Sequence, residues 1–400
     1  MESHRYRRTG EIRRFPFPHR DGLDPLPEFA ELRQYEPVVR VRLPSGDTAW
    51  LVTRHSDVRR VLTDPRFSRA RATRGTGPRI SRTTTLPHSV LAADPPDHTR
   101  LRKLIAPALT ARRAESMRRS IASLVDGLLT GLAALPQPTD LVTHFTRRLP
   151  LAIICDLLGT PHEDGERLDH WCEALRSVTA MTDDRVDSAV EEMTGYLAGL
   201  VSAKRAHPRD DMLSALIAAR DDDDRLSEDE LVSFCVVLLA GGYGTTANRL
   251  ASMVYLLLER PERYERLCRE PALVPGAIEE LLRYAQNTVG GNLRVATEEM
   301  ALGGVIIREG EAVMAVTGSA NHDERAFPHP DLLDLTRDVR SHLSFGHGAH
   351  FCVGAQVARV QLHEALAGLT ARFPTLYAAA PATWKSGLIS RAPRSLPVGW

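Results

Sequence analysis

One glycine-rich segment, Ser344 to Ala355, constrains this chain more than any other stretch. It places Cys352 immediately before a segment with the apolar periodicity of a helix, so this cysteine is predicted to lie at or just before a helix N-terminus. The helix dipole and the backbone N–H groups favour a thiolate over a thiol there. Gly346, Gly348 and Gly354 allow tight turns that bring N–H groups close to the sulfur. The segment therefore predicts a tuned thiolate that ligates a metal.

This cysteine has two other possible fates. A buried structural role is the commonest fate of a lone cysteine. His347, His350 and Cys352 could instead be three ligands of a zinc ion, although a closed zinc site needs a fourth ligand nearby. Taken alone, the segment favours the thiolate metal site over both alternatives.

The spacing Phe345-x-x-Gly348-x-x-x-Cys352-x-Gly354 resembles the haem-binding signature of the cytochrome P450 family, in which a cysteine thiolate ligates the iron. The resemblance implies that Cys352 is the metal ligand and that Phe345, Gly346 and Gly354 belong to a site for haem b (iron protoporphyrin IX). It also implies a mainly α fold with small β-sheets. In that fold, the haem lies between a long central helix and the helix that follows the cysteine loop.

A long apolar segment that opens with Ser227 and Glu230, the two residues of a capping box, matches the central helix. Its middle contains Gly241, Gly242 and Gly244, and each glycine costs about 1 kcal/mol relative to alanine in a helix. Close approach of a flat ligand or a local opening of the helix would justify this cost. Close packing against another helix is the alternative. By the resemblance, Gly241 and Gly242 are candidate haem-contacting residues.

The central helix of the family carries an acid and then a threonine after its glycines. Thr245 matches the threonine, whereas Gly244 stands where the acid belongs. The catalytic residues implied by the resemblance are therefore Gly244, Thr245 and Thr246, with no carboxylate to bring protons to the oxygen. Tyr243 is a poor proton source because the pKa of tyrosine is ordinarily near 10. We expect ordered water, Thr245, Thr246 and opened carbonyls to carry the protons, helped by a polar group of the substrate. A shift to other chemistry, such as radical coupling, is the competing hypothesis.

Basic residues at four places in the chain match the groups that hold the haem propionates. His98 and Arg102 lie four apart on one predicted helical face and could grip one anion together, although such a pair taken alone is more often a surface coincidence. The resemblance implies that they hold propionates together with Arg294 and His350.

Glu280 and Arg283, three apart, would be an ordinary helix pair if taken alone. The resemblance implies that they form a buried cluster with Arg337 and brace the cysteine loop. Leu388 matches a turn that reaches into the substrate chamber.

The rest of the chain is predicted to be mostly helical, with a small β part near each end. A turn signal at residues 44–47 predicts a hairpin, followed by a helix capped by Ser56 or Asp57. Residues 68–89 lack periodicity and predict a long loop of the kind that often forms a lid, and Ser177 to Asp187 is a candidate mobile cap. Further helices are expected at 112–134, 141–158, 164–178 and 186–206.

Charge and composition narrow the possible partners and the compartment. Lys and Arg together number 51, as do Asp and Glu, so no global basic field argues for nucleic acid or an anionic membrane. No continuous apolar segment follows the basic N-terminal residues, which argues against a secretory signal or membrane anchor. The 5 cysteines are widely spread and suit a reducing compartment, so we expect a cytoplasmic protein.

Together these motifs predict a single cytochrome P450 domain over residues 1–400, with residues 1 to about 20 as a candidate flexible arm. The resemblance implies a bacterial-type monooxygenase that hydroxylates or epoxidises a small organic substrate in secondary-metabolite biosynthesis. Dioxygen, an external ferredoxin and a ferredoxin reductase are the implied partners, and we expect a monomer. Oxidative coupling, desaturation or ring formation is the alternative within enzymes, and a non-catalytic haem sensor is the alternative from another class.

The loop at residues 68–89 contains four arginines. The simpler interpretation is that they form a solvated surface. The alternative is that they bind a polar or carrier-bound substrate. These arginines are Arg71, Arg74, Arg79 and Arg82.

Overall fold

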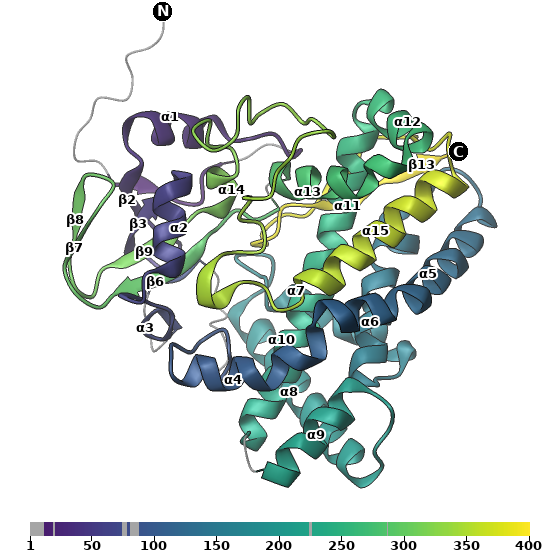
Figure 1. Cartoon of the computed structure of the whole chain (residues 1–400), viewed down its shortest axis with the longest axis horizontal. Coiled ribbons are helices and arrows are strands. Elements are labelled where there is room, and N and C mark those ends of the chain that lie inside the picture. Colours follow the sequence, from purple (N-terminus) through teal and green to yellow (C-terminus); the bar gives the residue numbers. More distant parts are fainter. Residues whose placement is uncertain (1–11, 19–20, 74–77, 81–87, 224–225, 286) are drawn as a thin grey trace, which may run out of the picture.

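The computed structural model describes residues 12–18, 21–73, 78–80, 88–223, 226–285 and 287–400. Helices make up most of it, and a sheet lies at one side of the helical part (Figure 1). The predicted fold class, mainly α with small sheets, is confirmed. The α-helices are α1 (Pro27–Tyr35), α2 (His55–Thr63), α3 (Arg69–Thr73), α4 (Asp97–Ile105), α5 (Ala111–Ala133), α6 (Arg148–Leu158), α7 (Gly165–Ala174), α8 (Asp183–Ala206), α9 (Met212–Asp223), α10 (Glu228–Gly242), α11 (Gly244–Leu258), α12 (Pro261–Arg269), α13 (Val274–Tyr284), α14 (Thr317–Ala320) and α15 (Ala355–Arg372).

The strands are short. They are β1 (Arg13–Arg14), β2 (Val38–Arg42), β3 (Thr48–Val52), β4 (Phe67–Ser68), β5 (Thr139–Asp140), β6 (Asn292–Ala296), β7 (Met300–Leu302), β8 (Val305–Ile307), β9 (Ala312–Ala315), β10 (Tyr377–Ala378), β11 (Thr383–Trp384), β12 (Pro393–Ser395) and β13 (Pro397–Gly399). Single turns of 3₁₀ or π helix also occur, and they are η1 (Ala106–Leu109), η2 (Val142–Thr146), η3 (His162–Asp164), η4 (Pro271–Leu273) and η5 (Gly348–His350).

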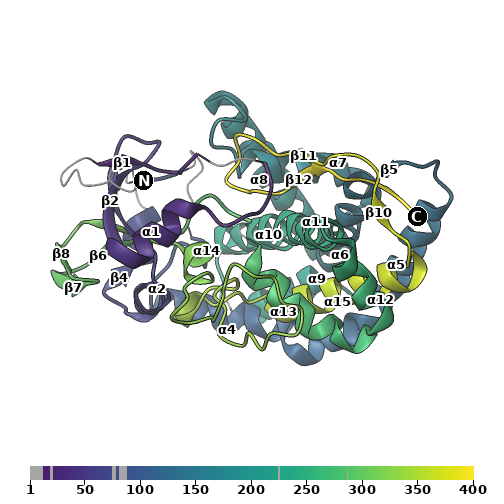
Figure 2. The same cartoon turned by 90° about the horizontal axis from the view of Figure 1, so that it is seen from above.

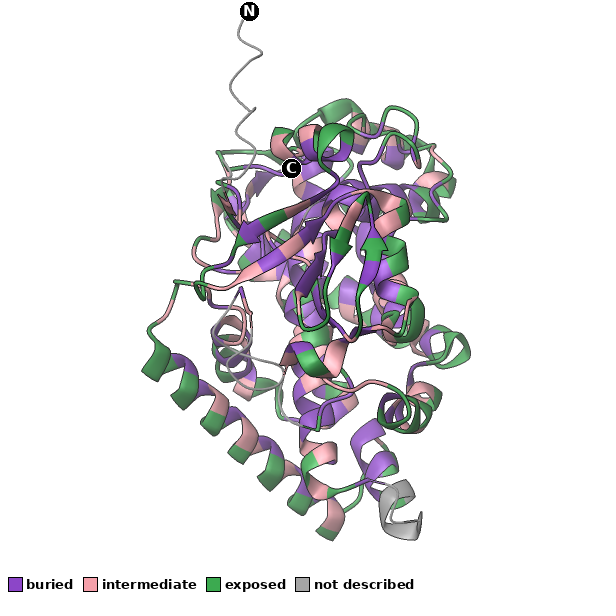
Figure 3. Ribbon diagram, turned by 90° about the vertical axis from the view of Figure 1, so that its left-hand side faces the viewer, coloured by how far each residue is buried: buried purple, intermediate pink, exposed green. Residues whose placement is uncertain are grey.

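The largest sheet has 6 strands in the order β1-β2-β3-β9-β6-β4, so it joins strands from both halves of the chain. The predicted hairpin is confirmed, because β2 and β3 pair antiparallel with Val38 opposite Val52. β3 then pairs with β9 in parallel, with Trp50 opposite Val313. Buried residues line these strands, and exposed residues lie mainly on the outer helices and loops (Figure 3).

The predicted cap of α2 is wrong. Neither Ser56 nor Asp57 caps this helix: it begins at His55, and its N-cap residue, Arg54, makes no side-chain cap. The backbone N–H of His55 instead donates to Asp323 Oδ2 at 2.8 Å. The cap is therefore a tertiary contact that no local sequence pattern contains.

The predicted loop at residues 68–89 is partly wrong, because Phe67–Ser68 is a strand and Arg69–Thr73 is a helix. Asp94 organises this start by accepting the backbone N–H of Arg69 at 2.8 Å. Arg71 pairs with Glu309 at 3.2 Å on the surface, which fits the interpretation of the loop arginines as a solvated surface. Residues 74–77 and 81–87, which include Arg74 and Arg82, lie outside the described part of the chain.

The helices of the core surround α10 and α11, which lie end to end through the middle of the molecule (Figure 2). The predicted capping box is confirmed, since Ser227 and Glu230 exchange both hydrogen bonds. Within the described residues, Glu228–Leu258 is the one helical stretch long and apolar enough to span a membrane. Most of its apolar window is buried against other helices of the protein, as expected of a core helix.

Candidate functional site

The cysteine loop ends where the sequence predicts a helix to begin. Gly354 is the N-cap of α15, and the backbone N–H of Cys352 donates to the Phe345 carbonyl at 2.9 Å. Gly346 and Gly348 have φ of +73° and +70°, a conformation that favours glycine. A Cβ on Gly348 would also lie 2.5 Å from the Leu62 carbonyl oxygen. The loop is thus shaped by its glycines.

The Cys352 side chain is exposed, unlike Cys155, Cys172 and Cys235, which are buried. The protein around the sulfur raises the pKa of the Cys352 thiol by desolvation, while the Gly354 N–H and the charge of Arg102 act in the opposite direction. A negative sulfur would therefore have a backbone donor and a nearby cation.

A buried carboxylate connects α13 to this loop. Glu280 is fully buried and accepts Arg283 Nε at 2.7 Å and Nη2 at 2.8 Å. Arg337 Nε reaches the same carboxylate at 3.2 Å, which confirms the predicted contacts among these three residues. Arg283 Nη1 donates to the Asn321 carbonyl at 2.8 Å. The Asn321 side chain accepts the Leu343 N–H at 2.7 Å, which carries the brace to the start of the loop.

A second brace was missed by the sequence analysis. Glu279 accepts Arg359 Nε at 2.7 Å and contacts His342 Nε2 at 2.9 Å. Burial acts to raise the pKa of Glu279, but the hydrogen bonds from His342 and Arg359 lower it to about 2. Arg359 also lies 4.5 Å from the centre of the Phe345 ring. The residue before the Glu-x-x-Arg motif thus supports Phe345, but only the fold brings its partners together.

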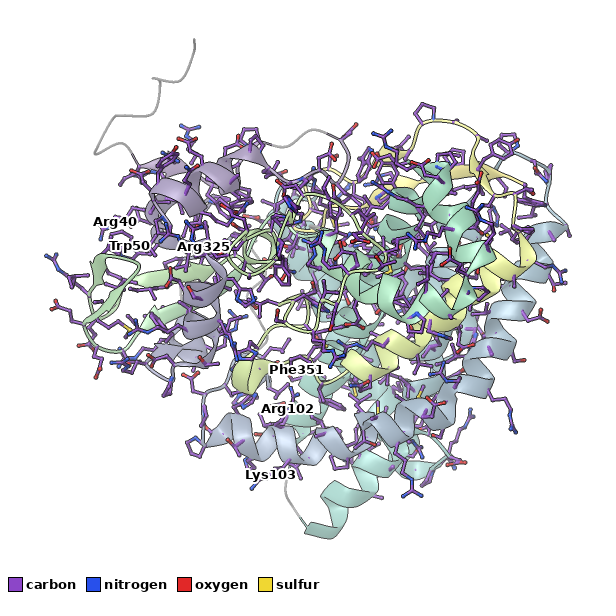
Figure 4. All side chains as sticks on the ribbon, turned by 45° about the horizontal axis from the view of Figure 1, so that its top comes forward. Arg40, Trp50, Arg102, Lys103, Arg325 and Phe351 are labelled. Atoms are coloured by element: carbon purple, nitrogen blue, oxygen red, sulfur yellow. The ribbon has the colours of Figure 1, made fainter. Side chains whose placement is uncertain are left out.

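The predicted propionate partners lie together in a cationic group, defined here as His98, Arg102, Arg294 and His350 with the added Arg69. The rings of His98 and His350 are 4.2 Å apart. Burial and neighbouring cations lower the pKa of His350 to about 3, and burial with the charge of Arg69 lowers the pKa of Arg294 to about 9. Figure 4 shows Arg102 on the side of α4 that faces Phe351, with Lys103 on the outer side.

This cationic group fits an anion. Arg294 is 3% exposed, and the hydrogen bond found for its guanidinium goes to the carbonyl of Leu293 at 2.9 Å. His98 Nε2 is buried and has no hydrogen-bond partner among the described residues. Burial and the charge of Arg69 lower the pKa of Arg294, and the charge of Asp94 acts in the opposite direction. Arg294 is therefore a buried cation without an ion-pair partner among the described residues, and such a charge is costly. A group with two carboxylates, such as haem, suits this donor set.

The zinc alternative for His347, His350 and Cys352 is not supported. Among the described residues, no three or more His, Cys, Asp or Glu side chains are arranged to hold a metal. The His347 side chain is instead bound to α2, because its Nε2 accepts a hydrogen bond from Arg59 Nε at 2.9 Å.

The glycines of the central segment have different surroundings. Gly241 is exposed, and a Cβ there would meet no atom within 4 Å, so it borders open space. A Cβ on Gly242 would lie 2.4 Å from Ile154 Cδ1, so close packing against α6 accounts for this glycine. Between them and α11, Tyr243 interrupts the helix with ψ of −79°. The local opening and the close packing that the sequence offered as alternatives therefore both occur.

Thr245 is exposed on the same segment, and its hydroxyl donates to the carbonyl of Gly241. Thr246 is only 6% exposed, so the two hydroxyls lie in different surroundings. The hydroxyl of Tyr243 is buried and donates to Asp169, and burial with the charge of Asp169 raises the pKa of Tyr243. The expectation that Tyr243 is a poor proton source is supported.

The segment predicted as a mobile cap is tied to the C-terminal part of the chain. α8 begins at Asp183, and Ser177 forms a β-bridge with Leu388. The Gly387 carbonyl accepts the N–H of Val178 at 2.8 Å and of Thr179 at 2.9 Å. Residues 177–182 are therefore an anchored connection next to Leu388, which the sequence analysis associated with the substrate chamber.

A family model for cytochrome P450 matches residues 167–378. Nocardicin C N-oxygenase from Nocardia uniformis subsp. tsuyamanensis is 46% identical over 98% of this chain and 99% of its own length. Mycinamicin IV hydroxylase/epoxidase from Micromonospora griseorubida is 43% identical over 98% of this chain and 100% of its own length.

Solved structures agree with these matches. The crystal structure of HinD with NMFT and NO superposes with a TM-score of 0.94 at 47% identity, covering 98% of this chain and 100% of that chain. The candidate thioether synthase SgvP, involved in a tailoring step of griseoviridin, superposes with a TM-score of 0.93 at 38% identity over 98% of this chain and 100% of that chain.

Proposed function

Because the chain belongs to the cytochrome P450 family, we propose that Cys352 ligates the iron of haem b and that the cationic group binds the two propionates. The chain is a cytochrome P450 monooxygenase, a haem-dependent oxidoreductase of the kind found in natural-product biosynthesis. The observation that carries the site assignment is the buried Arg294 guanidinium, which has no ion-pair partner among the described residues, together with the unpartnered Nε2 of His98 and the exposed Cys352. When bound, haem with a thiolate ligand supplies dioxygen activation and promotes O–O cleavage.

The residues of the chain have separate roles in this proposal. The Gly354 N–H and Arg102 stabilise negative sulfur, and the carboxylate of Glu280 holds the loop that presents it. Thr245 holds a hydroxyl at the open face of the central segment, where it would accept a proton from water and hand one on.

The cationic group makes a direct prediction. Arg294→Ala and Arg102→Ala are each expected to weaken haem binding about ten- to hundred-fold, because each removes a charge-assisted hydrogen bond to a propionate. The thiolate spectrum of the haem that remains should be unchanged. The transfer of haem to excess apomyoglobin measures this loss. Arg340→Ala, at a guanidinium that is 91% exposed, is the control. Unchanged transfer from both variants would place the propionates elsewhere.

Thr245 gives a second prediction. Thr245→Ala is expected to lower product formed per electron by about ten-fold or more and to raise hydrogen peroxide release, because the proton-carrying hydroxyl is lost. Thr245→Ser keeps a hydroxyl and is the control. Peroxide and product are measured against NADPH consumed, with a surrogate ferredoxin and reductase. Equal product yield from Thr245→Ala and the unmodified enzyme would refute the water-and-threonine relay and favour altered chemistry.

The proposed substrate is a small organic natural product that is hydroxylated or epoxidised. Two relatives support this class, because one is an N-oxygenase and the other is a hydroxylase/epoxidase. Oxidative coupling or ring formation is the second candidate, favoured by the structural likeness to SgvP. Adding candidate compounds to the ferric protein and recording the optical shift on binding separates an enzyme from a sensor, and analysis of the product of a compound that binds separates oxygen insertion from coupling. No response to any organic compound would favour a haem sensor.

We further propose a cytoplasmic monomer that receives electrons from an external ferredoxin and ferredoxin reductase, with no nucleic-acid or membrane partner. Phe351, 38% exposed on the cysteine loop, supports a docking face there, with the cation Lys103 on neighbouring α4 (Figure 4). Lys103→Glu should slow reduction by ferredoxin, because exposed charge steers association. The difference in reduction rate between this variant and the unmodified protein should shrink sharply at high salt, which screens that charge.

A further inference from the structure

Arg176 lies shortly after α7, beside the point where α10 and α11 meet. Its Nη1 donates to the Cys172 carbonyl at 2.8 Å, and its Nη2 donates to the Ala240 carbonyl. A Cβ built on Gly244 would lie only 2.5 Å from Nη1. The guanidinium therefore occupies the space into which a side chain at position 244 would project.

The backbone holds this side chain in place on both sides. The Arg176 N–H donates to the Glu173 carbonyl at 3.0 Å, and the Arg176 carbonyl accepts the Ile389 N–H at 2.8 Å. The next residue, Ser177, bridges to Leu388. Arg176 thus stands at the junction of the central segment and the Leu388 turn, and it remains partly exposed.

The charges around Arg176 do not balance. Arg147 pairs with Asp169, and Lys385 pairs with Glu173 at 3.3 Å. Among the described residues, no carboxylate lies within ion-pair distance of Arg176. Asp169 and Glu173 neutralise Arg147 and Lys385, so the positive charge of Arg176 is left over. This charge borders Gly244, one residue before the exposed Thr245.

We propose that Arg176 and Gly244 form a subsite for a carboxylate group carried by the substrate. The guanidinium has five N–H donors in a planar fork, and two carbonyls use only part of this capacity. A carboxylate is the anion that matches the fork in a bidentate way. The absence of a side chain on Gly244 lets the guanidinium lie against the central segment, and the partly exposed Arg176 leaves room for a carboxylate on its open side.

This inference rests on the proposed function and names the substrate class for the same site. At the Arg176 guanidinium, the substrate carboxylate supplies the negative charge that an acidic side chain at position 244 would bring, one residue before the hydroxyl of Thr245. It neutralises the excess charge and lies where it can exchange protons with water near that hydroxyl. The substrates are therefore amino acids, peptides or other organic acids, bound with the carboxylate toward Arg176.

Direct binding tests the subsite without turnover. The probes are phenylalkanoic acids from phenylacetate to 5-phenylvalerate and their methyl esters, titrated calorimetrically and optically into the ferric holoenzyme at pH 7.5. At least one acid is expected to bind about ten- to hundred-fold more tightly than its ester, because the charge-assisted hydrogen bonds to Arg176 are lost in the ester. Acids and esters of equal affinity throughout the series would overturn the subsite.

Variants assign the preference to Arg176. Arg176→Gln should abolish the preference for acid over ester, whereas Arg176→Lys should keep part of it, since it retains the charge but lacks the fork. Any side chain at position 244 has to displace the guanidinium, so Gly244→Ala should also weaken the preference. An unchanged preference in Arg176→Gln would contradict the proposal.

The carbon monoxide difference spectrum of each preparation separates this inference from the proposed function. If the unmodified protein lacks the thiolate-haem band, the proposed function itself fails. If the band is present and no acid is preferred, only the carboxylate subsite fails.

Discussion

Cys352→Ala is expected to abolish the red-shifted Soret band of the reduced, carbon monoxide-bound protein completely. Only a thiolate ligand gives that band, and Cys352 is the cysteine that combines exposure with a glycine-shaped loop and a backbone N–H donor at its sulfur. The measurement is the difference spectrum of protein reconstituted with haem.

Two further variants keep this test decisive if Cys352→Ala retains little haem. Cys352→His supplies a nitrogen ligand and should hold haem without the thiolate band. Cys155→Ala, at a buried cysteine on α6 where burial raises the pKa of the thiol, should keep the band in full. Persistence of the band in Cys352→His would show that another residue is the ligand.

Glu280→Ala is expected to lower the free energy of unfolding by about 3–5 kcal/mol and to yield protein that is largely free of haem. The reason is the fully buried Arg283, which would lose both hydrogen bonds to the carboxylate and keep an uncompensated charge. Denaturant unfolding and the ratio of haem to protein are the measurements.

The matched control for Glu280 is Glu298→Ala, which removes an exposed partner of Arg66. Exposed ion pairs contribute only about 0–1 kcal/mol, so this variant should behave like the unmodified protein. Glu280→Gln should fall between the two, because it keeps the shape and some hydrogen bonds but not the charge. Normal haem content and stability in Glu280→Ala would refute the bracing role.

Local sequence patterns correctly predicted the structural features that depend on residues adjacent in the chain. The capping box at Ser227, the hairpin of β2 and β3 and the start of a helix shortly after Cys352 are all present because a few adjacent residues determine each of them. The contact of Glu280 with Arg283 follows from their spacing on one helical face, whereas the contact with Arg337, which is distant in sequence, was predicted only through the family resemblance.

Tertiary contacts account for the features that the sequence did not predict. The Asp323 cap of α2, the support of Phe345 by Arg359 and the placement of Arg176 on Gly244 each join residues that no local pattern relates. A glycine in the sequence shows that space is needed, but not which side chain fills it. Gly242 and Gly244 illustrate this, because Ile154 packs on one and an arginine on the other.

The pairing of β3 with β9 has a consequence for synthesis of the chain. β3 ends at Val52 and its partner begins at Ala312, about 260 residues later. At about 5–20 residues per second, a ribosome takes roughly 13–50 seconds to make that interval. During this time, the β2–β3 hairpin presents an unpaired edge of Trp50, Leu51 and Val52. In the proposed haem site, His98 and Arg102 likewise emerge long before Arg294 and His350, so on this proposal cofactor loading waits until nearly the whole chain has been translated.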